Sequence, residues 1–439
     1  METIKVALLG LGTVGTGVYR TIESHQQYLQ SVLGASVEVK AILIQDQAKS
    51  RSVDIDPSVF VTTDINAIFE LPQLDVVIEM IGGLEPARGY IIEALSKGYH
   101  VITANKELMA YHGSELKNQA QLNGVKLTYE ASVAGAIPII RTLNQLLQVN
   151  QIRSIEGIIN GTSNFILSRM REKQCSFEEA LKDAQKAGYA EADPKNDIEG
   201  WDAFYKLMII SELVLEEQPD WSLVKREGIE TVSGNDIQIA NEFGLRIKLI
   251  ASLKRFEKGW VAKVEPVFID SVHPLYKVEG VDNALSVETD VAGRLFFQGP
   301  GAGSLPTASA IIEDLVDLWQ HRERSFIVPK EGFKENKVYL NQEHGSYWLF
   351  LLSHPHPFNQ VEQKRWENGF AENDLVLQKN KTINDSERGF ISGCILFGTR
   401  DQMNNFITQI KGYKAKYYPI SGWDENSLLE SVEKEAVLL

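Results

Sequence analysis

The first 140 residues alternate short apolar runs with longer stretches of helical periodicity. Each apolar run is bounded by Gly, Asn or Asp, as strands usually are. The runs lie at Ile4 to Leu9, Val37 to Ile44, Asp75 to Met80, His100 to Thr103 and Lys126 to Glu130, with helical stretches such as Gly15 to Leu33 and Pro86 to Lys97 between them. This order predicts an α/β fold over residues 1–140, with a doubly wound parallel sheet of the Rossmann type.

The pattern changes over residues 141–330. Helical segments come first, at Pro138 to Leu147, Ser163 to Lys173, Ser176 to Ala187 and Asp202 to Glu217, and strand-like alternation follows at Trp260 to Ile269 and Asn283 to Thr289. We interpret this region as an α+β substrate-binding domain. Gly301 to Trp319 has the pattern of a glycine-rich loop followed by a helix. We expect part of residues 301–330 to pack back on the first domain.

The last part of the chain, residues 345–439, has the pattern of a small separate βαββαβ domain. Strands are expected at Tyr347 to Leu352, Leu375 to Lys379, Phe390 to Phe397 and Ala415 to Ile420, and a helix at Asp401 to Ile410. The polar stretch Gln378 to Arg388 is expected to form a loop. Three domains are consistent with 439 residues at about 150 residues per domain.

Composition excludes several classes of protein. A net charge of −15 argues against a nucleic-acid surface, which needs a basic stripe. An anionic substrate would therefore depend on a few local cations. No apolar run approaches the ~18 residues needed to cross a bilayer, so no membrane partner is expected. The strand-like start of the chain favours a protein without a signal peptide, and only two cysteines, Cys175 and Cys394, fit a reducing cytoplasm.

A glycine motif follows the first predicted strand and opens the next helix. It reads Gly10-Leu11-Gly12-Thr13-Val14-Gly15. Gly10 permits a tight turn, Gly12 lets the backbone approach a pyrophosphate, and Gly15 lets helix and strand pack closely. The free N–H groups at the start of the helix would bind the phosphates. The motif predicts a bound NAD or NADP rather than a plain tight turn.

The sequence leaves the choice between NAD and NADP open. Asp46 is the nearest candidate for the acidic residue that binds a ribose 2′-OH, but it lies further from the glycines than the usual ~20 residues. It is equally consistent with a simple turn residue. Lys49 and Arg51 could instead hold a 2′-phosphate.

Lys106 is the first candidate catalytic residue. It follows Thr103-Ala104-Asn105 at the end of a predicted parallel strand, where such sheets bind ligands. The start of a helix disfavours a cation. A lysine at this place therefore indicates a bound anion or a catalytic task, with an ordinary solvated lysine as the alternative.

Asp202 and Lys206 form the second candidate. They are four residues apart and share one face of a helix whose other positions are mostly apolar. A surface ion pair is the simple alternative. The apolar surroundings instead indicate that the pair is buried. Because burying two charges costs free energy and adds little stability, a buried pair indicates a functional role. A carboxylate-rich loop with Gly188 and Glu191 precedes the pair.

A phosphorylating aldehyde dehydrogenase on the same cofactor fold is the alternative chemistry. It needs an activated thiolate. Cys175 lies in a polar stretch and Cys394 in the last domain, so neither is placed to attack a substrate. Hydride transfer with a lysine as the general acid or base fits the candidate residues better than thiolate chemistry does. A silent amino-acid sensor is a further alternative, which the retained charged residues disfavour.

These residues and others resemble the homoserine dehydrogenase family over roughly residues 1–330. The matching motifs are the glycine loop, Ile81-Gly82-Gly83, Thr103 to Lys106, Tyr129 to Pro138, Asn160 to Asn164, residues 187–206, His273 to Leu275, and Gly299 to Gly303 with Leu305 to Ser309. The resemblance implies an NAD(P)-dependent oxidoreductase that interconverts L-aspartate 4-semialdehyde and L-homoserine in threonine, methionine and isoleucine biosynthesis.

The resemblance also implies roles for single residues. Lys206 would donate the proton to the substrate carbonyl oxygen, Lys106 would lie between nicotinamide and substrate, and Asp202 and Glu191 would bind the substrate. Cofactor contacts would come from Gly10, Gly12, Thr13, Val14, Gly15, Lys106, Gly188 and Gly303. A structural sodium ion would be bound by carbonyl or carboxylate oxygens of Glu130, Val133, Gly135 and Ile137. The family is normally a homodimer through the middle domain.

The C-terminal domain departs from the family pattern. Many relatives carry an ACT regulatory domain with a Pro-Gly turn after its first strand. Here that place reads Ser353-His354-Pro355-His356-Pro357-Phe358, so we predict a divergent ACT-like domain without threonine feedback. We expect both histidines to be exposed loop residues rather than metal ligands.

Overall fold

The structure is a computed structural model that describes residues 2–48, 53–322, 337–339, 345–385, 389–410 and 413–421. The chain divides into two compact units. The first comprises Met1–Ile155, Asp202–Trp221 and Asp282–Lys337, and the second comprises Glu156–Trp201, Ser222–Val281 and Val338–Leu439. Each unit thus combines segments that are distant in sequence. The division into three consecutive domains stays a prediction.

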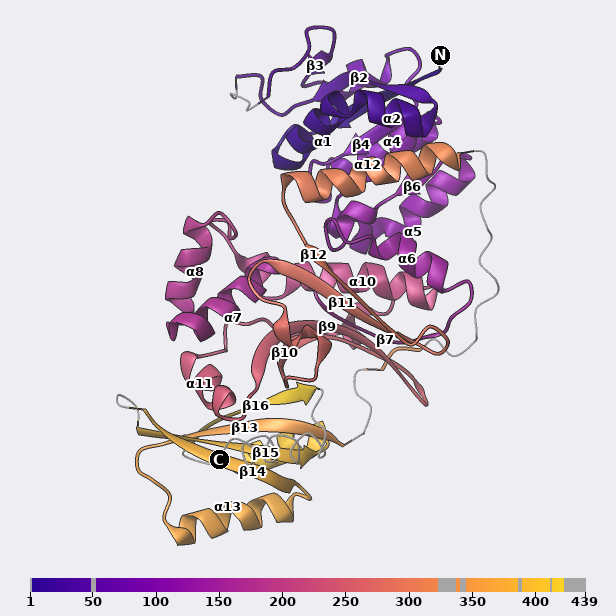
Figure 1. Cartoon of the computed structure of the whole chain (residues 1–439). Helices are drawn as coiled ribbons and strands as arrows, with labels where there is room; N and C mark the ends of the chain where they lie inside the picture. The colour runs from indigo at the N-terminus through magenta and orange to yellow at the C-terminus, as the bar shows by residue number, and fades with distance from the viewer. Residues whose placement is uncertain are drawn as a thin grey trace. The chain divides into compact units, whose positions relative to one another are not determined.

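A six-stranded parallel sheet forms the centre of the first unit (Figure 1). Its order is β3-β2-β1-β4-β5-β6. The strands are β1 (Glu2–Leu9), β2 (Ala35–Leu43), β3 (Phe60–Thr62), β4 (Val76–Glu79), β5 (His100–Thr103) and β6 (Leu127–Thr128). The predicted Rossmann-type α/β fold is confirmed. The strand order reverses between β1 and β4, and ligands of such sheets bind at the carboxyl ends of the strands beside that point.

The rest of the first unit is largely helical. The helices are α1 (Thr13–Ser24), α2 (Gln26–Leu33), α3 (Ile65–Phe69), α4 (Ala87–Ser96), α5 (Lys106–Leu122), α6 (Ile139–Leu146), α10 (Trp201–Leu215) and α12 (Ser304–Gln320), with the antiparallel pair β11 (Asp282–Thr289) and β12 (Arg294–Pro300). The single helix expected from Gly15 to Leu33 is wrong, because the chain breaks at His25 into α1 and α2. Figure 1 shows α12 beside α1, and both contribute to one apolar core with β1.

A second, largely antiparallel sheet includes the order β9-β10-β16-β13-β15-β14 within the second unit. Its strands are β9 (Arg246–Phe256), β10 (Gly259–Ile269), β16 (Lys414–Ser421), β13 (Ser346–His354), β15 (Gly389–Gly398) and β14 (Val376–Asp385), and the short β8 (Lys225–Arg226) pairs with β10. The helices are α7 (Gly161–Lys173), α8 (Phe177–Lys186), α9 (Lys195–Ile198), α11 (Gly234–Glu242), α13 (Gln360–Glu372) and α14 (Arg400–Gln409). The strand β7 (Ile152–Ile158) spans the boundary between the units.

The C-terminal elements follow the predicted βαββαβ order, from β13 and α13 through β14, β15 and α14 to β16. Two local predictions there are wrong. The stretch expected to be a loop after Gln378 continues as the polar strand β14, which lies at the end of the sheet, where charged side chains suit an edge strand. His354 is only 2% exposed and stacks on Phe358 with ring centroids 3.8 Å apart, whereas His356 is exposed as expected.

Within the described part of the chain, every helix is too short or too polar to span a lipid bilayer.

One fully buried lysine joins three segments of the second unit. Nζ of Lys248 on β9 donates to Oδ1 of Asn164 at 3.0 Å and to the carbonyl of Val278 at 2.5 Å. It also lies 3.2 Å from a carboxylate oxygen of Glu279. Burial lowers the pKa of Lys248 to about 8, although Glu279 opposes that shift. The lysine therefore links β9 to α7, and burial makes its charged form less favourable than it would be in water.

The buried lysine predicts a pH-dependent stability. The unfolded chain holds this proton up to a pKa of 10.5, so between pH 8 and that value it binds more protons than the folded chain. The free energy of unfolding should then rise with pH by up to about 1.4 kcal/mol per unit. Urea unfolding at several pH values should show this rise in the native chain and lose it in Lys248→Met. The exposed Lys258→Met is the control, and equal slopes in all three proteins would contradict the prediction.

Candidate active site

The three glycines of the loop after β1 have different surroundings. Gly10 has φ +105°, and a Cβ there would lie 2.9 Å from the carbonyl oxygen of Met80. A Cβ on Gly15 would lie 2.2 Å from the carbonyl oxygen of Gly10, so only glycine lets α1 start this close to the strand. A Cβ on Gly12 would meet no atom within 4 Å. Gly12 thus faces open space, as a backbone that approaches a phosphate requires.

The N-terminus of α1 is open to an anion. Gly12 is the N-cap residue and no side chain caps this end of the helix. Ser304 Oγ at the start of α12 donates to the carbonyl of Thr13 at 2.8 Å, which brings the glycine loop beside Gly303. Val14 lies in the first turn of α1 and is half-buried. The residues present therefore fit the diphosphate of a dinucleotide, with N–H groups and the helix dipole as the attracting groups.

Asp46 follows β2 and behaves as a turn residue. It is exposed, and its Oδ1 accepts a hydrogen bond from the N–H of Ala48 at 2.8 Å. Lys49 and Arg51, which could hold a 2′-phosphate, lie outside the described residues. The choice between NAD and NADP therefore stays open.

Glu79 at the carboxyl end of β4 is a buried residue that sequence reasoning missed. Its Oε2 accepts from the hydroxyl of Thr103 at 2.5 Å, and its Oε1 accepts from the N–H groups of Ile81 at 2.7 Å and Gly82 at 3.4 Å. Burial raises the pKa of Glu79, and these donors oppose that shift. The carboxyl group thus ties the ends of β4 and β5 together. A lone acid that ends an apolar strand at the ligand-binding edge was the available signal.

Asn105 continues this brace into α5. Its Nδ2 donates to the carbonyl of Gly83 at 2.7 Å, and its Oδ1 accepts from the N–H of Leu108 at 3.0 Å as the N-cap of the helix. Its own N–H donates to the hydroxyl of Thr103 at 3.0 Å. The next residue, Lys106, is therefore the first residue of a helix whose start is fixed on both sides.

Asp202 lies between two lysines at the start of α10. Its Oδ1 is 2.5 Å from Nζ of Lys106, and its Oδ2 accepts a hydrogen bond from Nζ of Lys206 at 2.7 Å. Asp202 and Lys206 are 3% and 8% exposed, so this is a buried pair rather than a surface pair. The side chain of Lys106 is 42% exposed and forms the open side of the cluster. We refer to these three residues as the lysine–aspartate cluster.

Glu212 fixes the same two helices further along, and sequence reasoning missed it as well. Its carboxylate accepts from the hydroxyl of Ser114 at 2.6 Å and lies 2.7 Å from Nζ of Lys117, both on α5. Glu212 is 7% exposed. The helices α5 and α10 are therefore linked by charged contacts at the cluster and again about three turns later.

Gly188 and Glu191 lie in the second unit, in the loop after α8. Gly188 has φ +76°, which ends the helix, and Glu191 is exposed. The motif from Asn160 to Asn164 holds this loop. Thr162 Oγ1 donates to the carbonyl of Tyr189 at 2.7 Å, and Asn160 Nδ2 donates to Oδ1 of Asp197 at 2.7 Å.

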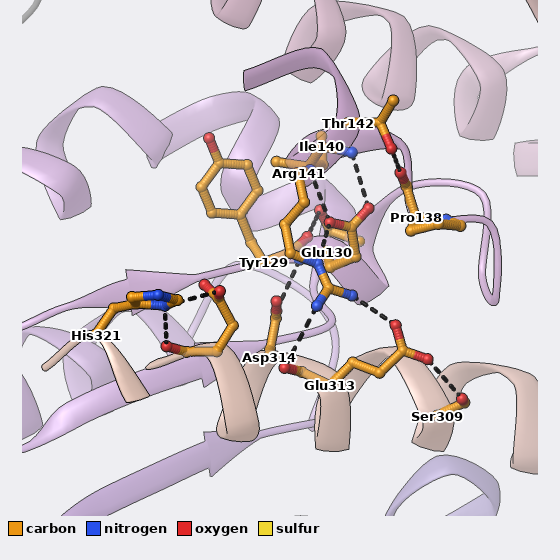
Figure 2. A network of polar contacts seen from close by, with 12 residues as sticks. Tyr129, Glu130, Pro138, Ile140, Arg141, Thr142, Ser309, Glu313, Asp314 and His321 are labelled. Atoms are coloured by element: carbon orange, nitrogen blue, oxygen red, sulfur yellow. Dashed lines mark hydrogen bonds and ion pairs between the residues drawn. The ribbon is translucent and has the colours of Figure 1, made fainter. Parts of the chain in front are cut away.

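The side chain of Glu130 is committed to the start of α6 (Figure 2). Its oxygens accept from the N–H groups of Ile140 at 2.8 Å and Arg141 at 2.9 Å. Its own N–H donates to Oδ2 of Asp314 on α12 at 2.9 Å. The Arg141 guanidinium also reaches Glu313 at 2.6 Å. The carboxylate of Glu130 thus caps the start of α6, and its main-chain carbonyl accepts from the N–H of Val133 at 3.2 Å.

The loop after Glu130 has the backbone of a tight cradle. Ala134 and Gly135 have φ values of +55° and +56°. A Cβ on Gly135 would lie 2.5 Å from the carbonyl oxygen of Gly301, and the N–H of Ala136 donates to the carbonyl of Pro300 at 3.2 Å. The described residues hold no cluster of three or more His, Cys, Asp or Glu side chains suited to a metal. A cation here would therefore be bound by main-chain oxygens, which suit a hard ion.

Comparison with known proteins agrees with this geometry. The family model described as the NAD-binding domain of homoserine dehydrogenase matches residues 10–130, and the homoserine dehydrogenase model matches residues 138–316. The homoserine dehydrogenase of Bacillus subtilis is 42% identical over 335 residues, which are 75% of this chain and 77% of that protein. The one from Neisseria gonorrhoeae is 41% identical over 365 residues, 81% and 83% of the two chains.

The chain belongs to the homoserine dehydrogenase family. Members of this family are NAD(P)-dependent oxidoreductases. The crystal structure of a homoserine dehydrogenase from Thiobacillus denitrificans matches 96% of this chain and 99% of its own, with a TM-score of 0.85 at 33% identity. A hyperthermophilic archaeal homoserine dehydrogenase in complex with NADPH matches 72% of this chain and 97% of its own, with a TM-score of 0.62 at 26% identity.

The cysteines do not support thiolate chemistry in this homoserine dehydrogenase family member. Burial raises the pKa of Cys394 to about 12 and also raises the pKa of Cys175, which the nearby Glu179 raises further. Both groups are therefore thiols at neutral pH. The alternative of a phosphorylating aldehyde dehydrogenase, which needs a thiolate nucleophile, is disfavoured on chemical grounds as well.

The glycine loop predicts opposite outcomes for two alanine substitutions. Gly15→Ala should lower the free energy of unfolding by roughly 1–3 kcal/mol, because its Cβ would overlap the Gly10 carbonyl. Gly12→Ala should leave the stability unchanged, since its Cβ meets open space, but should weaken NADPH binding by about tenfold or more by filling the approach to the pyrophosphate. Urea unfolding and fluorescence titration measure the two effects. Native NADPH affinity in Gly12→Ala would show that the loop does not hold the dinucleotide.

Proposed function

We propose that this chain reduces the aldehyde of L-aspartate 4-semialdehyde to the alcohol of L-homoserine, and catalyses the reverse reaction, with the lysine–aspartate cluster as the reactive centre. The observation that supports it is the buried Asp202 held between Nζ of Lys106 and Nζ of Lys206 in a chain with a net charge of −15. Two ammonium groups share one carboxylate, so the cluster keeps one positive charge. That charge attracts an anionic substrate that the protein as a whole would repel.

Lys206 donates the proton in this mechanism. A dinucleotide held by the glycine loop from Gly10 to Gly15 would supply the hydride to the carbonyl carbon. Negative charge then develops on the carbonyl oxygen, and the Lys206 ammonium gives it a proton, so one O–H bond forms as one N–H bond breaks. Lys106 and Asp202 then remain as a neutral pair, and no isolated charge is left buried. Asp202 orients the donor, because it is one helical turn earlier on the same face.

The other residues bind and orient the substrate and cofactor. Lys106 is the exposed side of the cluster and would contact the substrate and the nicotinamide. Glu191 would accept hydrogen bonds from the substrate ammonium group, which adds recognition of the amino-acid end. Val14 and Gly303 of the first unit would contact the cofactor, and Gly188 stays a predicted cofactor contact. The exposed state of Glu191 in its own unit is compatible with binding from solution.

The proposed proton donor predicts a large loss of turnover. Lys206→Met should lower kcat for homoserine-dependent NAD(P) reduction by about 10² or more, the usual range for loss of general acid–base help. NADPH binding should stay native-like, whereas the free energy of unfolding should fall, because the buried Asp202 then keeps only Lys106 as a cationic partner. Lys97→Met, at an exposed lysine paired with Glu93 on α4, is the matched control.

Two outcomes would contradict the proposal separately. Near-native kcat in Lys206→Met removes this residue from proton transfer. No reaction of the native chain with homoserine and either cofactor removes the proposed activity and leaves a ligand sensor as the better interpretation. The same assay with NADH and NADPH decides the cofactor, and a strong NADPH preference would remove a ribose role for Asp46.

The cradle after Glu130 is proposed to bind a sodium ion through the carbonyl oxygens of Glu130, Val133, Gly135 and Ile137. The two left-handed residues Ala134 and Gly135 turn the chain within this stretch. The ion would be structural, because a carbonyl-ligated monovalent cation is a weak Lewis acid. Its binding would add stability by mass action.

Sodium should therefore raise the melting temperature. Thermal unfolding is compared in sodium chloride and tetramethylammonium chloride at equal ionic strength, because the larger cation cannot fit a carbonyl cage. A rise of a few degrees at saturating sodium corresponds to about 1 kcal/mol for a chain of this kind. Identical melting temperatures in the two salts would exclude the proposed site. The homodimer implied by the family resemblance and the cytoplasmic location indicated by the low cysteine content stay predictions for this chain.

A further inference from the structure

A cavity of about 320 Å³ lies within the second unit, where β10 changes its pairing partner. The edge of β10 pairs with β8 at Lys263 and Val264, and with β16 only from Phe268 onward. Between these points, Glu265 and Pro266 line the gap, and on this edge of β10 they pair with no described strand, whereas the other edge pairs with β9. Because Pro266 has no backbone N–H, the missing strand leaves no unpaired donor at that residue. The volume falls at the lower end of the range for small-molecule sites.

One buried carboxylate at this gap is surrounded by three cations. Glu265, with a side chain 7% exposed, lies 2.6 Å from Nη2 of Arg400, 2.9 Å from Nζ of Lys225 and 3.7 Å from Nζ of Lys263. Burial opposes ionisation, but the three cations outweigh it and bring the pKa of Glu265 to about 2. Glu227 at the rim pairs with Lys225 at 2.8 Å. Three positive groups thus share two carboxylates.

The guanidinium of Arg400 has one unpaired hydrogen-bond donor among the described residues. Its side chain is 13% exposed and lies over the Trp348 ring, 5.1 Å from the centroid. Its Nε is buried and has no hydrogen-bond acceptor among the residues that the structure describes. A buried donor without an acceptor is unfavourable. An acceptor oxygen delivered from the cavity would satisfy this group.

The remaining walls suit a small organic body. Ile407, Ala415, Tyr417 and Pro419 line the cavity, and Lys416 stands at the rim with its side chain 44% exposed. Lys416 pairs with Asp236 at 3.0 Å, so it adds no surplus charge to the resting site but remains movable. Apolar walls with a few directed polar groups are typical of ligand sites.

We infer that this cavity binds a small organic oxyanion, a carboxylate or a phosphate ester, against Arg400 and Lys225. The surplus positive charge, the unpartnered Nε and the apolar walls each point to this class of ligand. A bound oxyanion would accept from Arg400 Nε and balance the third cation. The site lies wholly in the second unit and is independent of the proposed hydride transfer.

Calorimetric titration of the full chain with inorganic phosphate and with benzoate tests this inference, with sodium chloride at equal ionic strength as the reference. Lys416→Gln should weaken binding about two- to fivefold, which is the usual range for one exposed charge. Glu227→Gln should tighten it by a similar factor, because it removes a carboxylate that competes for Lys225. A gain in affinity cannot result from misfolding. Lys364→Gln, an exposed lysine on α13, should change nothing.

Each outcome bears on the inference. Binding of either probe with opposite effects of the two variants supports it, and the tighter probe distinguishes a phosphate ester from a carboxylate as the natural ligand. Absence of binding by both probes overturns it. Binding that neither variant changes also overturns it, since the anion would then lie elsewhere on the chain.

Discussion

The carboxylate of Asp202 is the group on which the reactive part of the first unit depends. A carboxylate that is 3% exposed is strongly destabilised unless opposite charges and hydrogen bonds compensate for lost water. Lys206 supplies one partner by helix geometry alone, because it is one turn later on α10. Lys106 supplies the other only when α5 lies in one position against α10. The placement of these two helices therefore determines whether the cluster exists.

Other buried carboxylates hold α5 in that position. Glu79 joins the ends of β4 and β5, so the loop before Lys106 starts from a fixed point. Glu212 contacts α5 through Ser114 and Lys117, which limits sliding of one helix along the other. Such contacts are hydrogen bonds to charged groups, among the stronger ones in proteins. The fold thus uses unreactive acids to position reactive lysines.

The sequence predicts those parts of the fold and of the site that depend on residues close together in the chain. The glycine loop and the pair Asp202 and Lys206 are local patterns, and the parallel sheet follows from the alternation of strands and helices. Glu79 and Glu212 act through residues 24 and about 100 positions away, which periodicity does not reveal. Polar β14 resembled a loop because an edge strand needs few apolar residues.

The two cation clusters show how an acidic chain can keep positively charged sites. In each, one buried carboxylate holds more than one cation: two lysines at Asp202, and two lysines and an arginine at Glu265. The carboxylate offsets part of the repulsion among the cations, and low exposure weakens screening by water and salt. What remains is a local positive charge that the net charge of −15 does not cancel at short range. Because a balanced pair would attract no anion, the surplus cation is the feature that gives each cluster a capacity to bind.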